Sequence, residues 1–377
     1  MLSAQHGQEI IDLINLRVER SMNGMAEKNL TNDAMPTDTI ETSDAKVMGK
    51  TPLVTVLMIT YNHAAYLSDA IHGVIMQKCD FPFELIIGED CSTDATRKIA
   101  LEYQKEYPDI IRVIHSSRNV GMSRNSKRIF DLARGKYVAY CEGDDFWCDP
   151  EKLAKQVAMM EANPEIGIVH TDWVRSRLID EEWRHDFKRS VHSRVANKYL
   201  QGNLYSCWHF PKILRTCTYL VRRETMAQWY ASGLLDNRYP FGDAVLSSWI
   251  TSRFMVGYIP AVTAVYRVSP NSALRSGAAA RISFYKYSLE FDTAARRFFS
   301  GTGYGDGYRW DSAASLIIWG LRARDFHAVK HGILDFCKHF TLPNFLATGI
   351  KNVIMRLPTL KRQRRWVPAS ASQCQRK

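Results

Sequence analysis

Between residues 51 and 150, short apolar segments rich in β-branched side chains alternate with segments in which apolar residues recur at helical spacing. This pattern predicts strands at 53–60, 83–87, 110–115 and 136–141, and helices at 65–76, 95–107 and 122–134. Strands that alternate with helices in this way are typical of a parallel α/β sheet. The sequence therefore predicts an α/β fold for this part of the chain.

Polar residues follow each predicted strand directly. The segments are Tyr61-Asn62, Glu89-Asp90, Asn119 to Gly121, and Glu142 to Asp145. Because parallel strands share one carboxyl-end edge, where ligands bind, we expect these segments to converge on one crevice. No G-x-G-x-x-G motif follows the first strand and no G-x-x-x-x-G-K-S/T motif is present. This argues against a dinucleotide oxidoreductase and a P-loop ATPase.

The segment at the end of the fourth strand is strongly acidic. Glu142, Asp144 and Asp145 place three carboxylates within four residues. Like charges this close repel unless a cation or a proton is shared, and a hard divalent cation prefers oxygen ligands. A solvated acidic turn is the alternative. The position at a strand end favours the metal site.

The rest of the chain falls into regions of different composition. Residues 8–20 have helical spacing, and the polar stretch 23–50 predicts a linker. After the acidic segment, we predict helices at 151–161, 224–231 and 245–250, and strands at 166–172, 216–223, 256–260 and 264–269, with an irregular stretch at 175–210. Helices are predicted at 282–299 and 310–331. We therefore expect an N-terminal helix and flexible linker at 1–50, a catalytic domain at 51–270 and a helical C-terminal region at 271–377.

Charge is unevenly distributed along the chain. The formal net charge is +11, and residues 351–377 hold eight Lys or Arg and no acidic residue. This predicts an anionic partner for the basic tail and no nucleic-acid-binding body. An apolar stripe at 346–357 beside these cations suits the surface of an anionic membrane. A helix packed on the catalytic domain, followed by a solvated basic tail, is the alternative.

Cysteine usage and hydropathy bear on the compartment. The eight cysteines show no C-x-x-C pair or zinc-type spacing, and no apolar run approaches the length needed to span a bilayer. The first residues lack the pattern of a signal peptide. We expect a cytoplasmic protein with free thiols that associates peripherally with the inner face of the membrane.

Five sequence pieces together carry a family resemblance. They are V-T-V-L-M-I-T-Y-N at 54–62, G-E-D-C-S-T-D-A-T at 88–96, N-V-G at 119–121, A-R-G-K-Y-V-A-Y-C-E-G-D-D-F-W at 133–147, and F-G-D at 241–243. In this order and spacing, residues 51–267 resemble the family 2 glycosyltransferases. The resemblance implies the GT-A fold, a mixed central sheet flanked by helices, and transfer of a sugar from a nucleotide-diphosphate donor.

The resemblance also implies roles for individual residues. Residues Thr60, Tyr61 and Asn62 would line the nucleotide site, Asp90 would bind the uracil or ribose, Asn119 and Gly121 would form the turn beside the base, and Arg128 or Lys127 would help bind the diphosphate. Asp144 and Asp145 look like the pair that positions Mg²⁺ or Mn²⁺ on the donor diphosphate. Glu142 stands where many members have the first Asp of this motif, and which two of the three carboxylates bind the metal stays open.

Asp243 is the candidate general base. It lies at a Gly-preceded helix start, where an acidic residue is also favoured by the helix dipole alone. Sugar transfer needs a hydroxyl that loses its proton as it attacks, and a positioned carboxylate can accept that proton. The family places its base Asp at such a helix start. Many relatives have a histidine at the position of Ser269, so its absence concerns metal or phosphate binding, whereas Arg267 remains able to reach an anionic donor.

Together with the resemblance, these features predict a metal-dependent glycosyltransferase, and the resemblance implies that transfer inverts the anomeric configuration. The resemblance implies a UDP-sugar donor and a saccharide or lipid-linked acceptor, in cell-surface polysaccharide synthesis. The alternative is a non-catalytic nucleotide-sugar-binding or membrane-docked scaffold protein.

Overall fold

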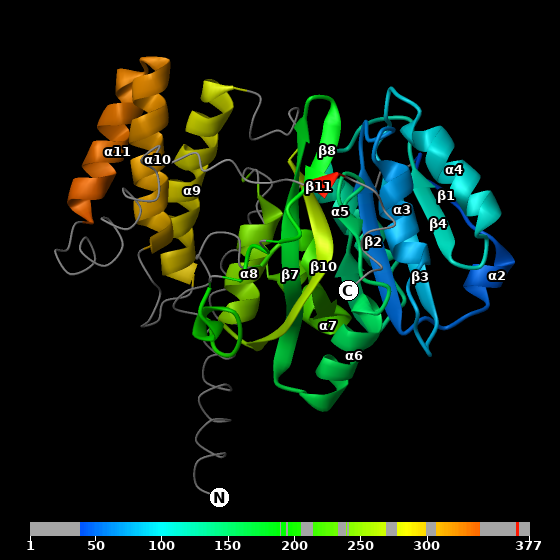
Figure 1. Cartoon of the computed structure of the whole chain (residues 1–377). Helices are drawn as coiled ribbons and strands as arrows, with labels where there is room; N and C mark the ends of the chain where they lie inside the picture. Colours follow the sequence, from blue (N-terminus) through cyan, green and yellow to red (C-terminus); the bar gives the residue numbers. More distant parts are fainter. Residues whose placement is uncertain are drawn as a thin grey trace, which may run out of the picture.

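A computed structural model gives the fold of this chain (Figure 1). It describes residues 38–188, 190–193, 195–204, 214–232, 239, 241–268, 277–298, 307–339 and 367–368. The predicted helix at 8–20, the apolar stripe at 346–357 and Ser269 lie outside the described residues.

The core is one mixed β-sheet. Its strands are β1 (Ile40–Thr42), β2 (Val54–Thr60), β3 (Phe83–Glu89), β4 (Ile111–His115), β5 (Tyr137–Tyr140), β6 (Phe146–Trp147), β7 (Ile166–Ile179), β8 (Glu182–His185), β9 (Leu220–Arg222), β10 (Met255–Val268) and β11 (Val367–Pro368). Their order is β1-β4-β3-β2-β5-β9-β7-β10-β6, with β8 beside β7 and β11 beside β8. Strands β4, β3, β2 and β5 are parallel, and β9 runs antiparallel between β5 and β7.

Helices cover both faces of this sheet. They are α2 (Ala45–Met48), α3 (Leu67–Ile75), α4 (Thr96–Glu106), α5 (Met122–Asp131), α6 (Lys152–Ala162), α7 (Arg223–Ala231), α8 (Gly242–Thr251), α9 (Ala278–Phe298), α10 (Gly307–Ala323) and α11 (Phe326–Lys338), with short 3₁₀ turns at Asn197–Tyr199 and Thr216–Thr218. One apolar core joins α3, α4 and α6 to the sheet, and a second joins α5, α7, α8 and α9 to it. Strand β2 supplies both cores because its side chains alternate between the two faces.

The strand order creates a switch point beside β2. From β2 the chain proceeds through β3 to β4 on one side, whereas β5 pairs with β2 on the other. Ligands of open α/β sheets bind where the strand order reverses, outside the carboxyl ends of the strands. The polar segment after β2 and the acidic segment after β5 both lie at this point, as the alternation of strands and helices predicted.

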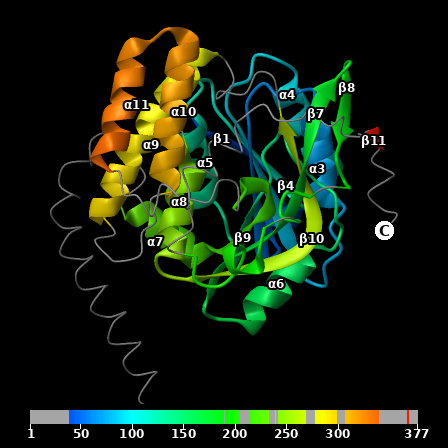
Figure 2. The ribbon, with the colours of Figure 1, turned by 60° about the vertical axis from the view of Figure 1, so that its left-hand side comes forward.

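Helices α9, α10 and α11 lie side by side at one end of the molecule in both views (Figures 1 and 2). A small apolar core that includes Ile282, Leu289, Leu316 and Ala328 holds the three together. Within the described part of the chain, no helix has both the length and the hydropathy that crossing a bilayer requires.

Several predicted boundaries differ from the structure. The stretch predicted to be irregular at 175–210 contains the end of β7 and all of β8, and the strand predicted at 216–223 is a 3₁₀ turn followed by β9. The polar stretch at 23–50 is not a linker throughout, because Ile40–Thr42 forms β1 and pairs with β4. The strands predicted at 256–260 and 264–269 are one long strand, β10. The single helix predicted at 310–331 is two, because Arg324 takes a left-handed φ of 56° and the side chain of Asp325 then caps α11 by accepting the Ala328 N–H.

Candidate active site

The acidic turn, residues Glu142 to Asp145, follows β5 directly and is held by backbone hydrogen bonds. The Gly143 N–H donates to the Ile59 carbonyl at 3.0 Å, and the Asp145 N–H donates to the Glu142 carbonyl at 3.0 Å. The turn therefore lies against the end of β2. A Cβ added at Gly143 would lie 2.7 Å from Thr60 Oγ1 and 2.9 Å from His63 Nδ1, so no side chain fits there.

Asp145 is buried at the base of the turn. Its Oδ1 accepts the Arg267 N–H at 2.8 Å, whereas its Oδ2 is buried and accepts no hydrogen bond from the described residues. Burial, reinforced by the negative charge of Asp144, raises the pKa of Asp145 well above its ordinary value. A buried carboxylate oxygen without a donor is costly unless a proton or a cation shares it.

The pKa of Glu142 is also raised well above its ordinary value. Burial is the largest cause of its raised pKa, followed by the charges of Asp145, Asp144 and Asp243. Because Asp243 lies about a hundred residues later in the chain, this interaction indicates that the fold brings the start of α8 near the acidic turn.

Asp243 lies in the first turn of α8, where its Oδ1 accepts the N–H of Ala244 at 2.9 Å. The charge of Asp243 acts on the side chain of Arg215. Burial is the largest single effect on the pKa of Arg215 and lowers it, but the charges of Asp243 and its neighbours together outweigh burial and the net shift is upward. The guanidinium of Arg215 lies 4.5 Å from the ring centre of Tyr266 and 5.1 Å from that of Trp173. Aromatic faces hold this cation beside three carboxylates.

The loop after β2 lies directly beside the acidic turn. Asn62 takes a left-handed φ of 55°, and its Oδ1 accepts the Thr93 N–H at 2.9 Å while its own N–H donates to Ser92 Oγ. These bonds tie the loop after β2 to the loop after β3. Tyr61 remains exposed beside it, and Thr60 Oγ1 is buried with no hydrogen-bond partner among the described residues.

Asp90 organises the loop after β4. Its two carboxylate oxygens accept the N–H groups of Val120 and Gly121 at 2.8 and 2.9 Å. Asn119 donates to the Asp90 carbonyl at 2.9 Å, and Gly121 takes a φ of 86° that favours glycine. The structure thus brings Asp90, Asn119 and Gly121 together, next to the loop that contains Asn62.

Arg128 differs from its predicted role beside the diphosphate. It is buried, and its guanidinium donates to the side chains of Ser116 and Asn125 and to the Glu89 carbonyl. These contacts hold the carboxyl end of β3 in place. Lys127, the alternative, is half-exposed and forms an ion pair with Asp131. The contacts of both residues are structural.

His63 is a site residue that the sequence pattern did not single out. Its Nδ1 is buried beside Gly143 and has no hydrogen-bond partner within the described residues. Burial lowers the pKa of His63, against the opposing effect of the Asp144 carboxylate. Its position three residues after a strand end was the available signal, but a lone histidine is a weak one.

Arg267 positions the acidic turn, and its own side chain is buried. Its side chain is 4% exposed, pairs with Asp69 and donates to the Asp144 carbonyl at 3.4 Å. The rings of Phe146 and Tyr66 lie 4.7 and 5.4 Å from its guanidinium. The cation is therefore used to hold β10 against the turn.

The carboxylates of the turn suit a hard cation that takes its remaining ligands from a substrate. Within the described residues, no group of three or more His, Cys, Asp or Glu side chains forms a complete metal site. Mg²⁺ is commonly held by one or two carboxylates together with substrate phosphates. Asp144, half-exposed, and the unpartnered Oδ2 of Asp145 match that incomplete donor set.

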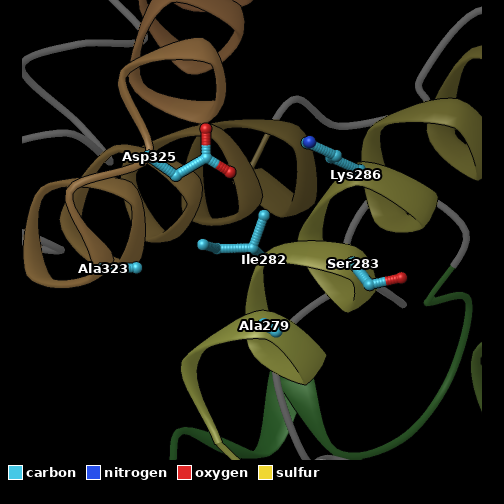
Figure 3. A pocket seen from close by; sticks show the side chains of 6 residues that line it. All are labelled: Ala279, Ile282, Ser283, Lys286, Ala323 and Asp325. Atoms are coloured by element: carbon cyan, nitrogen blue, oxygen red, sulfur yellow. The ribbon is translucent and has the colours of Figure 1, made fainter.

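A hollow of about 440 Å³ lies elsewhere, between α9 and the junction of α10 and α11 (Figure 3). Lys286 and Asp325 are the charged residues among its lining, together with Ala279, Ile282, Ser283 and Ala323. None of the candidate site residues lines it, so it is separate from the active site.

Comparison with known proteins gives the family. Residues 55–217 match the model of Glycosyl transferase family 2. The match identifies residues 55–217 as a family 2 glycosyltransferase domain. The matched part includes every predicted site residue of the donor side and of the acidic turn, and it ends before Asp243.

Curated relatives of this glycosyltransferase domain match over part of their length. An uncharacterized protein of Mycobacterium tuberculosis is 37% identical over 158 residues, 40% of this chain and 45% of the relative. The putative teichuronic acid biosynthesis glycosyltransferase TuaG of Bacillus subtilis is 38% identical over 109 residues, 29% of this chain and 42% of TuaG. The chain thus spans less than half the length of these relatives.

Among solved structures, the mannosyltransferase PcManGT of Pyrobaculum calidifontis, in complex with GDP-Man and Mn²⁺, has a similar fold. The TM-score is 0.50 at 17% sequence identity, over 91% of this chain and 92% of that protein. This likeness, together with the mixed sheet and flanking helices, gives this chain the GT-A fold.

Proposed function

We propose that this protein is an inverting glycosyltransferase that moves a sugar from a nucleotide-diphosphate donor to an acceptor hydroxyl. The observation that carries the proposal is the electrostatic coupling of Asp243 to Glu142 and Arg215. It supports a base near a diphosphate site, which is the pair of functions that sugar transfer requires.

The proposed reaction gives each of these groups one role. The acceptor hydroxyl loses its proton to a carboxylate oxygen of Asp243 as the hydroxyl oxygen attacks the anomeric carbon. The bond between that carbon and the diphosphate oxygen breaks on the opposite face, so the anomeric configuration inverts. Arg215, held by Tyr266 and Trp173, supplies a positive charge beside these carboxylates.

A divalent cation on Asp144, with Asp145 or Glu142 as second ligand, would neutralise the departing diphosphate. The buried Oδ2 of Asp145 and the raised pKa values of Glu142 and Asp145 support a cation at this turn. The Mn²⁺ bound by PcManGT supports the same proposal for the ion, Mg²⁺ or Mn²⁺.

The donor side is formed by the segments after β2, β3 and β4. We propose that Thr60, Tyr61 and Asn62 border the nucleotide, and that Asp90 with Asn119 and Gly121 binds the base or ribose of a UDP-sugar. The acceptor is proposed to be a saccharide or a lipid-linked saccharide of a cell-surface polysaccharide. The name of TuaG, a putative teichuronic acid biosynthesis glycosyltransferase, supports this class of acceptor.

Asp243→Asn tests the base directly. Asn cannot accept a proton at neutral pH, so kcat should fall about 10²- to 10⁴-fold, while donor affinity changes little. Isothermal titration with the donor and Mn²⁺ measures binding, and release of nucleoside diphosphate measures turnover. The matched control is Asp109→Asn, an exposed Asp paired with Lys50 far from the site, which should retain wild-type kcat.

Two results would contradict the proposal. Full transfer activity in Asp243→Asn rules out this residue as the base. If no nucleotide diphospho-sugar raises the melting temperature with either ion, the donor site itself is wrong. Tight UDP binding without turnover on any acceptor would instead favour the non-catalytic binding protein.

A further inference from the structure

The outer end of the helical bundle exposes large apolar side chains. Phe326 is 74% exposed, Leu334 58%, Leu321 57% and Ile333 46%. All four lie on α11 or at the end of α10, within 14 residues of one another. Single exposed apolar residues are ordinary in soluble proteins, but a contiguous group points to an interaction surface.

The spacing on α11 shows that three of these side chains share one face. Phe326, Lys330, Ile333 and Leu334 recur at intervals of three and four residues, so they share one side of the helix. Ala328 and Gly332, on the other side, are buried; a Cβ at Gly332 would lie 2.7 Å from the side chain of Ile317 on α10. The bundle thus uses one side of α11 and leaves the other outward.

The exposed side is also basic. Arg322, Arg324, Lys330 and Lys338 are exposed on the same stretch. The acidic residues within 321–339 are Asp325 and Asp335, and both are already engaged: Asp325 caps α11, and Asp335 forms an ion pair with Arg309. We call Leu321, Arg322, Phe326, Lys330, Ile333 and Leu334 the apolar–basic face.

We propose that the apolar–basic face docks on an anionic lipid surface. Large apolar side chains would enter the boundary between headgroups and acyl chains, and the neighbouring cations would lie at the level of the lipid phosphates. A partner protein would fit this face less well than a membrane. Four cations beside an apolar stripe, with no exposed carboxylate among them, suit a uniformly negative surface.

The position of this face in the fold and in the sequence supports the proposal. Helix α11 forms the outer edge of the molecule, at the end opposite α4 and β1 (Figure 1). The sequence that follows it holds the eight basic residues of 351–377, so cations continue along the chain beyond the face. Docking through α11 would leave the sheet and its candidate active site clear of the lipid.

The experiment compares binding of the full-length protein to two kinds of vesicle. Phosphatidylcholine vesicles containing phosphatidylglycerol should sediment the protein at low salt, and phosphatidylcholine alone should not. The double variant Phe326→Ser, Leu334→Ser should bind at least about tenfold more weakly. Lys330→Glu should weaken binding about fivefold or more, because each cation near an anionic surface contributes about one factor of five.

Ile40→Ser is the matched control, since Ile40 is a 53% exposed apolar residue of β1 at the other end of the molecule. It should bind as wild type does. Circular dichroism and release of nucleoside diphosphate without vesicles should be unchanged in all variants, which separates this inference from the proposed function. Equal binding by the double variant and Ile40→Ser, or equal binding to both vesicle types, overturns the proposal.

Discussion

At the scale of single residues, the acidic turn depends on a position without a side chain. Gly143 lets the turn approach Thr60 and His63, both of which carry buried polar atoms without hydrogen-bond partners in the described structure. Unsatisfied buried polar atoms are costly, so they concentrate where a ligand completes them. The turn is therefore arranged for an occupant.

We predict that Gly143→Ala damages this turn. The new methyl would overlap Thr60 Oγ1 and His63 Nδ1, so the carboxylates of the turn must shift. We expect a loss of about 1–3 kcal/mol in stability. Nucleoside diphosphate release should fall more than about tenfold because a misplacement of about 1 Å is enough to cost that. Thermal melting and a turnover assay measure both effects.

Gly242→Ala provides the matched comparison. A Cβ at Gly242 meets no atom within 4 Å, although the residue adjoins Asp243. This variant should keep wild-type stability and turnover. If both alanine variants behave alike, the steric argument at Gly143 is wrong.

Residue types at strand ends were enough to predict the acidic turn, but not to separate cations that brace the fold from cations that lie beside the carboxylates. Arg128 and Arg215 look alike in sequence. The structure uses Arg128 to brace β3 from within and places Arg215 beside Asp243. The surroundings of each arginine depend on which elements pack against it. Those elements are distant in the sequence, so a local pattern does not reveal them.

At the scale of elements, strand and helix positions in the α/β half followed the sequence closely, because buried parallel strands are continuous apolar runs. The C-terminal bundle was predicted less well. The periodicity of 310–331 continues across the turn between α10 and α11, so it could not mark the break at Arg324. The capping Asp325 was the available signal.

A buried ionic network joins the three helices of this bundle. Arg309 of α10 donates to Asp292 of α9 at 3.0 Å and pairs with Asp335 of α11. Asp292 is fully buried and also pairs with Arg296 at 2.7 Å. Removing one partner of a buried pair leaves an uncompensated charge.

We predict that Arg309→Met destabilises the protein by about 3–5 kcal/mol, because it leaves Asp292 and Asp335 without their shared cation. Urea unfolding measures the loss. Arg296→Met should cost less, since Arg296 is more exposed and touches Asp292 from the same helix. Equal losses in the two variants would show that the network does not join the helices energetically.

At the scale of the whole molecule, the sheet brings two sets of buried titratable groups into one folded unit, and their pKa shifts oppose each other. Glu142 and Asp145 have raised pKa values, chiefly through burial, so the folded state binds their protons more readily than the unfolded state. They add stability as the pH falls. Buried histidines act in the other direction.

His170 of β7 is the clearest of these histidines. Its Nε2–H donates to the Leu200 carbonyl at 2.6 Å, and burial lowers its pKa from 6.5 to about 3. Below pH 6.5 the unfolded chain therefore takes up a proton that the folded chain refuses until about pH 3. Stability from His170 is complete above pH 6.5 and is lost as the pH falls through this window.

We predict that this loss reaches about 2 kcal/mol between pH 6.5 and pH 5, at 1.36 kcal/mol per pH unit. His170→Gln keeps a donor for the Leu200 carbonyl but cannot take up the proton, so its stability should fall less over this range. The free energy of unfolding of each protein is measured at several pH values in this range. The difference between the two pH profiles isolates His170 from the opposing carboxylates, which are present in both proteins. The control His331→Gln, at an exposed position of α11, should follow wild type. Parallel curves for wild type and His170→Gln would mean that the imidazole of the folded protein is protonated as readily as that of the unfolded chain.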